Sequence, residues 1–334
     1  MRSAANRCLQ TLIIPLALSA LALPSPAQDA KKEADDLLSA VVRVRSKILP
    51  NARSTATLGS SREGSGVLIR EGLVLTIGYL VIEAESVEVA NDEGRTVPAT
   101  LAGYDHASGF GLLKLVLPFG GTPLPLGDSA ALGKGDQVMI ASFGGRESAS
   151  LAHVVSRRQF SGGWEYLLDS AIFTYPPVMN WSGAALIGPK GELLGMGSLI
   201  VPDAARPGTQ SPGNMFVPID LLKPILGDLL ANGRAAGPVR PWLGMNTEEL
   251  RGRVFVARVS PEGPADRAGV RDGDIVMGVG GEDVTSLAEF YRKVWSRGAA
   301  GAEIPLKVLQ GTQVKEFRLR SIDRLEYFRA RPNY

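Results

Sequence analysis

Short apolar segments, separated by glycine, proline and polar residues, make up much of the chain between residues 41 and 232. In the first half of this region the segments are 41–45, 64–69, 72–76, 87–89 and 97–101. Each is long enough for a strand, and no helical pattern alternates with them. The pattern predicts an all-β barrel or sandwich, in which the segment 41–45, with its alternating valine and arginine, is an exposed edge strand.

A Gly/Pro-rich linker at residues 233–241 precedes a different order of elements. The predicted elements beyond it are strands at 254–259, 273–276, 304–309 and 315–319, which close a small barrel, and a helix at 287–294. We therefore expect two domains, at residues 29–232 and 242–325. Residues 326–334 are charged and aromatic, and we expect them to form a C-terminal tail.

The N-terminal residues 1–28 have the pattern of a secretory signal peptide. Arg2 and Arg7 precede the apolar run 12–23, and small residues follow it before Gln28. The run is shorter than the roughly 20 residues of a membrane span, so contact with a membrane would require that the segment stay uncleaved. The pattern predicts a periplasmic or secreted protein whose mature chain begins near Gln28.

Composition excludes several classes of site. The chain has 334 residues with 36 Lys and Arg against 34 Asp and Glu, which gives no electrostatic case for binding nucleic acid. The single cysteine, Cys8, lies in the predicted signal peptide, so the mature chain has no disulfide and no thiolate. Its histidines, His106 and His153, are far apart and form no ligand cluster. We expect no metal and no cofactor.

A turn that carries a serine lies between two apolar runs at residues 178–186 (Val-Met-Asn-Trp-Ser-Gly-Ala-Ala-Leu). It resembles the nucleophile loop Gly-Asn-Ser-Gly-Gly-Pro-Leu of trypsin-type serine proteases, and the segments that follow, 191–196 and 216–219, resemble their HtrA/DegP branch. The resemblance implies a mainly β fold, a trypsin-like double β-barrel, with Ser182 as the nucleophile. It assigns the oxyanion hole to the backbone N–H groups of Asn180 and Ser182, and Asn180, which replaces a glycine, is expected to tolerate left-handed geometry.

The same resemblance implies that the other two triad residues are replaced. Residues 64–76 match the lead into the catalytic histidine, but Tyr79 stands at the histidine position. Residues 105–114 match the pattern Asp-x-x-x-Asp-Leu-Ala-Val-Leu-Lys, with Gly109 in place of the orienting aspartate. A phenol with a pKa of about 10 cannot accept the serine proton at neutral pH. We expect a protease fold with a degenerate triad, a pseudoprotease.

Two other functions stay open at this point. The chain could be a serine endopeptidase that uses Ser182 with a non-standard base, for which His106 or Lys114 is conceivable, although each is better explained as an ordinary surface or structural residue. His153 is expected to be a structural histidine in a strand. A third possibility is a structural module with neither function.

Residues 242–245 (Trp-Leu-Gly-Met) resemble the carboxylate-binding loop of PDZ domains, and the strand, helix and Gly-Asp-Ile pattern after them agrees. The resemblance implies that backbone N–H groups around Leu243, Gly244 and Met245 bind the C-terminal carboxylate of a protein or peptide, which adds a strand to the domain. The predicted peptide-binding residues are Trp242, Leu243, Gly244, Met245, Phe290 and Val294, the last two either core-facing or groove-lining. A homo-oligomer, a trimer, is implied by the resemblance alone.

Overall fold

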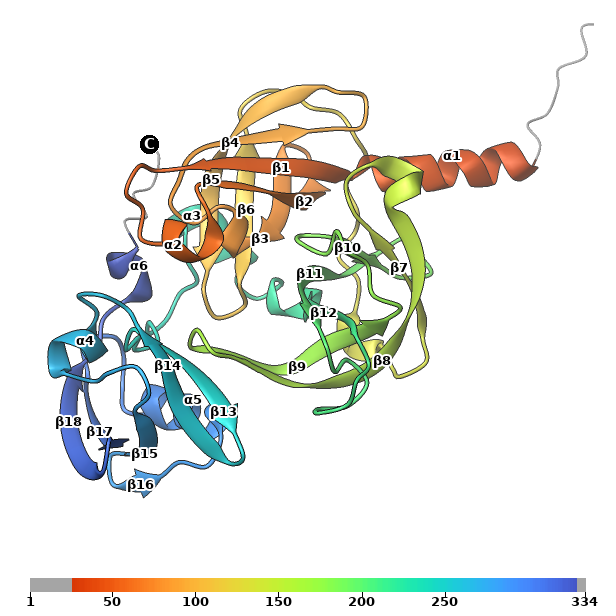
Figure 1. The fold of residues 1–334 in the computed structure, drawn as a ribbon. Coiled ribbons are helices and arrows are strands. Elements are labelled where there is room, and N and C mark those ends of the chain that lie inside the picture. Colours follow the sequence, from red (N-terminus) through yellow and green to blue (C-terminus); the bar gives the residue numbers. More distant parts are fainter. Residues whose placement is uncertain (1–25, 329–334) are drawn as a thin grey trace, which may run out of the picture.

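The structure, a computed structural model, describes residues 26–328. The first part of the chain forms a closed barrel of antiparallel strands (Figure 1). In barrel order the strands are β1 (Val41–Ile48), β2 (Ser61–Arg70), β3 (Leu73–Ile77), β6 (Phe110–Leu115), β5 (Thr96–Asp105) and β4 (Ala84–Ala90). The prediction that 41–45 is an edge strand is wrong, because β1 pairs with both β2 and β4 and a closed barrel has no edge.

Helix α1 (Pro26–Ser39) leads into this barrel and extends away from it (Figure 1). The predicted signal peptide falls almost entirely on residues 1–25, outside the described residues. Within residues 26–328 no helix has the length and apolar character needed to cross a membrane. The other short helical segments of the two barrels are α2 (Thr55–Leu58), η1 (Gly78–Leu80), η2 (Ser129–Ala131), η3 (Gly145–Ser148), η4 (Ile219–Leu221) and α3 (Leu226–Asn232).

A second closed barrel follows, and its strands differ greatly in length. In barrel order they are β10 (Ala185–Ile187), β11 (Leu193–Val201), β12 (Gly213–Pro218), β9 (Tyr166–Tyr175), β8 (Ala149–Gly162) and β7 (Gln137–Ala141). The long β8–β9 hairpin extends toward the C-terminal domain, and residues 163–165 form its turn (Figure 1). The predicted double barrel is therefore confirmed.

The two barrels share one apolar core. Phe110 of β6 in the first barrel and Phe173 of β9 in the second are both fully buried in the same cluster. Such burial of large aromatic side chains dominates core energetics, so the barrels pack as one body. Loops from both barrels can then be held in a fixed relation at the junction.

Residues 233–241 carry no helix or strand and connect the barrels to a C-terminal domain. This domain is an open sheet, not the small closed barrel that we predicted, and β13 lies at its edge. The strand order is β13 (Met245–Leu250), β14 (Arg253–Val259), β15 (Ile275–Val279), β17 (Glu303–Gln310) and β18 (Gln313–Arg320), with β16 (Glu282–Asp283) paired to β15. Its helices are α4 (Pro264–Ala268), α5 (Leu287–Trp295) and α6 (Arg324–Tyr327).

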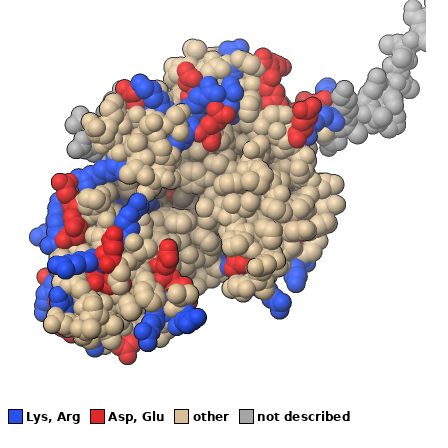
Figure 2. Space-filling view, in the orientation of Figure 1, with Lys and Arg blue, Asp and Glu red and all other residues tan. Residues whose placement is uncertain are grey.

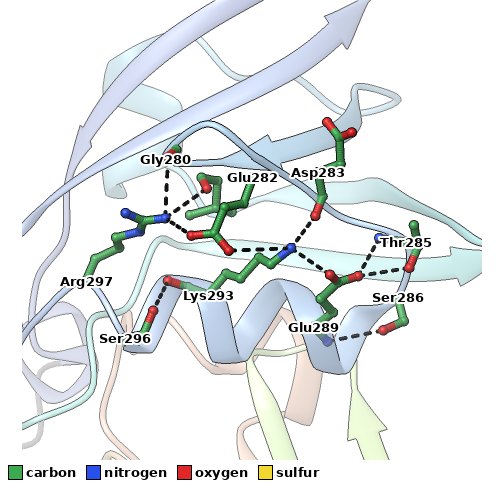
Figure 3. Close-up of polar contacts among 10 residues, drawn as sticks. Gly280, Glu282, Asp283, Thr285, Ser286, Glu289, Lys293, Ser296 and Arg297 are labelled. Atoms are coloured by element: carbon green, nitrogen blue, oxygen red, sulfur yellow. Dashed lines mark hydrogen bonds and ion pairs between the residues drawn. The ribbon is translucent and has the colours of Figure 1, made fainter.

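Helix α5 is fixed to this sheet by a polar network on its outer side (Figure 3). The Ser286 hydroxyl accepts the N–H of Glu289 and caps the helix. Lys293 donates to the carboxylate of Glu289 at 2.6 Å. This bond is the largest of the causes that lower the pKa of Glu289 to about 2. Arg297 bonds Glu282 on the neighbouring turn at 2.7 Å. These contacts position the opposite face of α5 against the domain core.

The C-terminal residues expected to form a tail are partly structured. Helix α6 packs on the C-terminal domain, with the Tyr327 ring 4.6 Å from that of Trp242. The Tyr327 hydroxyl also donates to the carbonyl of Pro261 at 2.9 Å. Residues 329–334 lie outside the described residues.

Candidate active site and peptide groove

Ser182 lies on a turn between β9 and β10, pressed against the first barrel. Its carbonyl accepts the N–H of Ser65 in β2 at 2.8 Å, and the N–H of Gly183 donates to the carbonyl of Gly197 at 2.8 Å. Gly183 has φ +71°, and a Cβ there would lie 1.9 Å from the carbonyl oxygen of Ser65. Only glycine fits this position, and the half-buried Ser182 hydroxyl is thereby fixed at the junction of the barrels.

Tyr79, on the short helix η1 that follows β3, contacts Ser182 directly. Its hydroxyl lies 2.9 Å from the Ser182 Oγ and 2.9 Å from the carbonyl oxygen of Ser198. The single phenolic proton serves one of these acceptors at a time, so when it bonds Ser198 the Ser182 hydroxyl donates to the phenol oxygen. Burial raises the pKa of Tyr79 to about 12. The predicted pair therefore meets, but the phenol stays protonated and is not a base at neutral pH.

Gly109 lies next to this pair through the backbone. Its carbonyl accepts the N–H of Gly78, the residue before Tyr79, at 2.7 Å. Gly109 has φ +82°, and a Cβ on it would lie 3.3 Å from the Tyr166 hydroxyl. That hydroxyl donates to the carbonyl of Ser108 at 2.5 Å. The position thus has a left-handed backbone and a tyrosine beside it, and both disfavour an aspartate.

The alternative bases make no contact with Ser182, although His106 lines the same cavity. His106 contacts the Tyr104 hydroxyl at 3.3 Å and the guanidinium of Arg324. Burial, together with Arg324, holds the pKa of His106 well below its usual value. Lys114 is exposed on β6, and His153 is exposed on β8 and not buried as a structural histidine would be. None of the three hydrogen-bonds Ser182, and in the part of the chain that the structure describes no group of three or more metal-ligating side chains occurs.

The predicted oxyanion donors are not used by the protein itself. Among the described residues, the backbone N–H groups of Asn180 and Ser182 donate to no acceptor. Asn180 does not adopt the left-handed conformation that we expected it to tolerate. Its carbonyl instead accepts the Ser142 hydroxyl at 2.6 Å. The turn therefore keeps two free donors beside Ser182 without a glycine at 180.

Ser182 faces a cavity of about 1570 Å³ between the barrels and the C-terminal domain. Tyr79 and Trp181 line it from the barrels, and Arg258 and Tyr327 line it from the C-terminal domain. A volume of this size holds an extended peptide segment, since typical small-molecule sites measure about 300–1,000 Å³.

The predicted carboxylate-binding loop binds a carboxylate of the same chain, that of Glu165. The N–H groups of Gly244 and Met245 donate to Glu165 Oε1 at 2.8 and 3.2 Å, and that of Leu243 donates to Oε2 at 2.9 Å. Gly244 has φ +79°, which explains the glycine. Sequence reasoning identified the three donors and missed Glu165, because nothing local to the β8–β9 turn indicates where it lies.

The other predicted groove residues occupy different places. The Trp242 ring packs on α6, and Phe290 and Val294 are each 1% exposed in the core of the C-terminal domain. Tyr291 is the α5 residue that reaches the loop region, where its hydroxyl lies 3.0 Å from the Thr247 hydroxyl. Tyr291 and Thr247 were missed, although a tyrosine within an apolar helical pattern, whose polar tip needs a partner, is a signal that could have found the first.

Comparison with known families finds a match for each of the two parts of the chain that carry these residues. Residues 64–196 match the trypsin-like peptidase domain, and residues 241–320 match the PDZ domain. Both matches contain the segments described above: the first includes Tyr79, Gly109 and Ser182, and the second includes the carboxylate-binding loop and α5.

The relatives are named as proteases, and the matches to them cover about three quarters of this chain. The "Probable periplasmic serine protease do/HhoA-like" of Haemophilus influenzae is 28% identical over 275 residues, 77% of this chain and 57% of the relative. The "Periplasmic pH-dependent serine endoprotease DegQ" of Escherichia coli is 28% identical, over 74% of this chain and 56% of the relative. The chain thus spans a little over half the length of these relatives. It covers 79% of the "Serine endoprotease DegS" of Escherichia coli, at 26% identity.

Solved structures agree on the fold. That of the "HtrA-type protease AlgW with decapeptide" has a TM-score of 0.53 and 21% identity, and the match covers 87% of this chain and 98% of that one. The chain therefore has an HtrA-type protease fold, in which a trypsin-like peptidase domain is joined to a PDZ domain, and its relatives are named serine proteases.

Proposed function

We propose that this chain is an exported HtrA-type pseudoprotease that binds the C-termini of proteins through its PDZ domain. The contact between the Tyr79 hydroxyl and the Ser182 Oγ, at 2.9 Å, carries the first half of the proposal. A serine nucleophile needs a group that takes its proton as it attacks, and a phenol whose pKa is raised to about 12 does not do so at neutral pH. The left-handed backbone of Gly109 supports the same conclusion, since it disfavours the orienting carboxylate.

The second candidate is a serine endopeptidase that uses Ser182 with a base assembled on substrate binding. Two observations favour it: the N–H groups of Asn180 and Ser182 are free, and the serine faces a cavity large enough for a peptide. His106 lines the same cavity, but it is bound to Arg324 and Tyr104. Reactivity of Ser182 toward a fluorophosphonate separates the two functions.

Binding of C-termini is supported by the three donors of the loop 243–245 and by the edge position of β13. We expect mature protein to bind peptides with a free C-terminus at about micromolar Kd, and amidation of the peptide to weaken binding more than tenfold, because the amide loses the charge that the loop holds. Fluorescence anisotropy with a C-terminal peptide library measures both.

A matched glycine pair tests the loop in the same assay. Gly244→Ala strains φ +79° and brings a Cβ within 3.2 Å of the Trp242 ring, so we expect at least tenfold weaker binding. Gly281→Ala is the control, because Gly281 also has a left-handed φ, +85°, in a turn of the same domain with nothing within 4 Å. Unchanged binding after amidation, or equal losses in both variants, would contradict carboxylate recognition. Absence of any bound peptide would favour a structural module.

Export is supported by the relatives, which are named as periplasmic, and by the sequence of residues 1–28. We expect the mature chain to begin near Gln28, which N-terminal sequencing and intact mass of protein from the cell envelope measure. A chain that keeps Met1 in the membrane fraction would contradict cleavage.

The distribution of charged side chains gives no support for a nucleic-acid partner. Figure 2 shows basic and acidic side chains mixed over the C-terminal domain and a largely uncharged face of the barrels, without a basic stripe. We propose no nucleic-acid partner. A homo-oligomer, with three subunits, remains part of the proposal through the resemblance to HtrA-type proteases.

A further inference from the structure

The turn of the β8–β9 hairpin lies in the place that a bound peptide would take beside β13. The N–H of Thr247 in β13 donates to the carbonyl of Gly163 at 2.8 Å, as an edge strand bonds an added strand. From the α5 side, the Tyr291 hydroxyl donates to the carbonyl of Gly162 at 2.8 Å. Residues 162–165 therefore lie between β13 and α5, bonded to both.

Backbone contact at this place is close. A Cβ on Gly163 would lie 2.4 Å from the carbonyl oxygen of Thr247. The close approach of the hairpin to β13 therefore requires a residue without a side chain at position 163. Glu165 has φ +60°, an uncommon conformation for a glutamate, and its N–H bonds the Tyr291 hydroxyl at 3.2 Å. That turn directs its side chain into the loop 243–245.

The carboxylate of Glu165 completes the likeness to a peptide terminus. The side chain is 4% exposed, and its two oxygens accept the N–H groups of Leu243, Gly244 and Met245. These are the donors expected to hold a C-terminal carboxylate, and two carboxylates cannot share them because like charges at this distance repel. We propose that residues 162–165 are an internal ligand of the PDZ groove, with Glu165 in place of a C-terminal carboxylate, and that a partner's C-terminus binds by displacing them.

Displacement has a consequence for the protease fold. Residues 162–165 join β8 to β9, and Tyr166, the first residue of β9, lies beside Gly109 and bonds Ser108. Movement of the hairpin turn would therefore shift Tyr166, and through it Ser108 and Gly109 in the loop next to Tyr79. The proposal rests on the proposed binding of C-termini and adds what occupies the groove before the partner arrives.

Removal of the internal carboxylate tests the proposal in the mature full-length chain. We expect Glu165→Ala to bind a peptide with a free C-terminus about 10- to 100-fold more tightly than wild type, because the binding-competent fraction rises. Gly163→Val should tighten binding as well, since it displaces the turn from β13 and keeps Glu165. An equal or weaker affinity in both variants overturns the proposal.

Asp169→Ala is the matched control. Asp169, also on β9, is paired with Arg292 of α5 at 2.5 Å, with a side chain that is 80% exposed, so its loss removes a carboxylate contact between the same two domains without touching the loop. We expect its peptide affinity to stay within about twofold of wild type. A gain equal to that of Glu165→Ala would show that any loosening of the domains suffices, and would overturn the role of Glu165.

Amide hydrogen exchange without peptide separates this proposal from the proposed function. We expect the amides of 243–247 to exchange at least tenfold faster in Glu165→Ala than in wild type, while Asp169→Ala leaves them unchanged. If exchange rises but no free C-terminus binds any variant, the binding of C-termini fails and the occupancy of the loop stands. If exchange is unchanged, the internal ligand is refuted even where peptides bind.

The pH dependence of binding gives an independent readout. Burial raises the pKa of Glu165 to about 7, although the hydrogen bonds from the three backbone N–H groups lower it. The groups facing it are the guanidinium of Arg324, His106, whose pKa is held well below its usual value, and Tyr291, whose pKa is raised by burial. Glu165 is therefore the group among them whose pKa is raised to near neutral pH.

Proton binding to Glu165 sets the direction of this dependence. The closed state, with the raised pKa, binds a proton that an exposed glutamate would release, so raising the pH from 5 to 8 favours displacement of Glu165. We expect wild-type affinity for a free C-terminus to increase over this range and that of Glu165→Gln to stay constant. A parallel pH profile in the two proteins would contradict the proposal.

Discussion

Mature wild-type protein is expected to hydrolyse casein no faster than its Ser182→Ala variant. The reason is that Tyr79 bonds Ser182 at 2.9 Å without acting as a base, and that Gly109 supplies no carboxylate. Loss of triad function costs on the order of 10⁴- to 10⁶-fold in rate, and what remains comes from the oxyanion donors and binding. Release of labelled peptide from casein, with a typical active serine protease as reference, measures the difference.

Covalent labelling with a fluorophosphonate tests the reactivity of Ser182 directly. We expect intact mass to show no fluorophosphonate adduct on wild type, because attack on phosphorus needs the same deprotonated serine. The Tyr79→Phe variant is a useful control, since it removes the hydroxyl contact and adds no base. Rapid stoichiometric labelling, or casein cleavage that Ser182→Ala abolishes, would refute the pseudoprotease and establish the serine endopeptidase.

Restoration of the triad is expected to be incomplete for a structural reason. In the double variant Tyr79→His, Gly109→Asp, the histidine takes the place of the phenol, but the aspartate enters a position with φ +82° and the Tyr166 hydroxyl 3.3 Å from its Cβ. The carboxylate is therefore not held where it orients the imidazole. We expect any gain in casein cleavage to come from Tyr79→His alone.

The largest loss of stability is expected from Gly183→Ala. Its methyl group would lie 1.9 Å from the backbone carbonyl oxygen of Ser65, in a left-handed conformation, so the serine turn or β2 must move. Such overpacking with backbone strain costs about 3 kcal/mol or more, and lowers Tm by on the order of 10 °C for a domain of this size. Thermal unfolding followed by circular dichroism measures it.

Gly72→Ala separates the two causes. Gly72, in the turn between β2 and β3, has φ +67° but nothing within 4 Å of an added methyl group, so it carries the backbone strain without the clash. We expect a loss of about 1–2 kcal/mol there. Equal shifts of Tm for the two variants would show that the serine turn is not pressed against β2 as described.

Local pattern was sufficient for much of the fold. The strand segments of the first barrel and of the C-terminal domain, and the helix near 287–294, were predicted, because alternation and helical spacing act over a few neighbours. The expectation that Tyr79 stands at the histidine position likewise depends only on the segment that carries it. The loop 243–245 was predicted for the same reason.

Tertiary structure decided what depends on residues far apart in the chain. Closure of the first barrel makes β1 an interior strand although its pattern is that of an edge. Tyr79 and Ser182 are far apart in the sequence, and only the packing of the two barrels brings their hydroxyls to 2.9 Å. Glu165 is an ordinary turn glutamate in the sequence. Its place in the carboxylate loop, bonded to Gly244 at 2.8 Å, depends on how the hairpin meets the PDZ domain, because such contacts are set by the relative position of whole elements and not by their own residues.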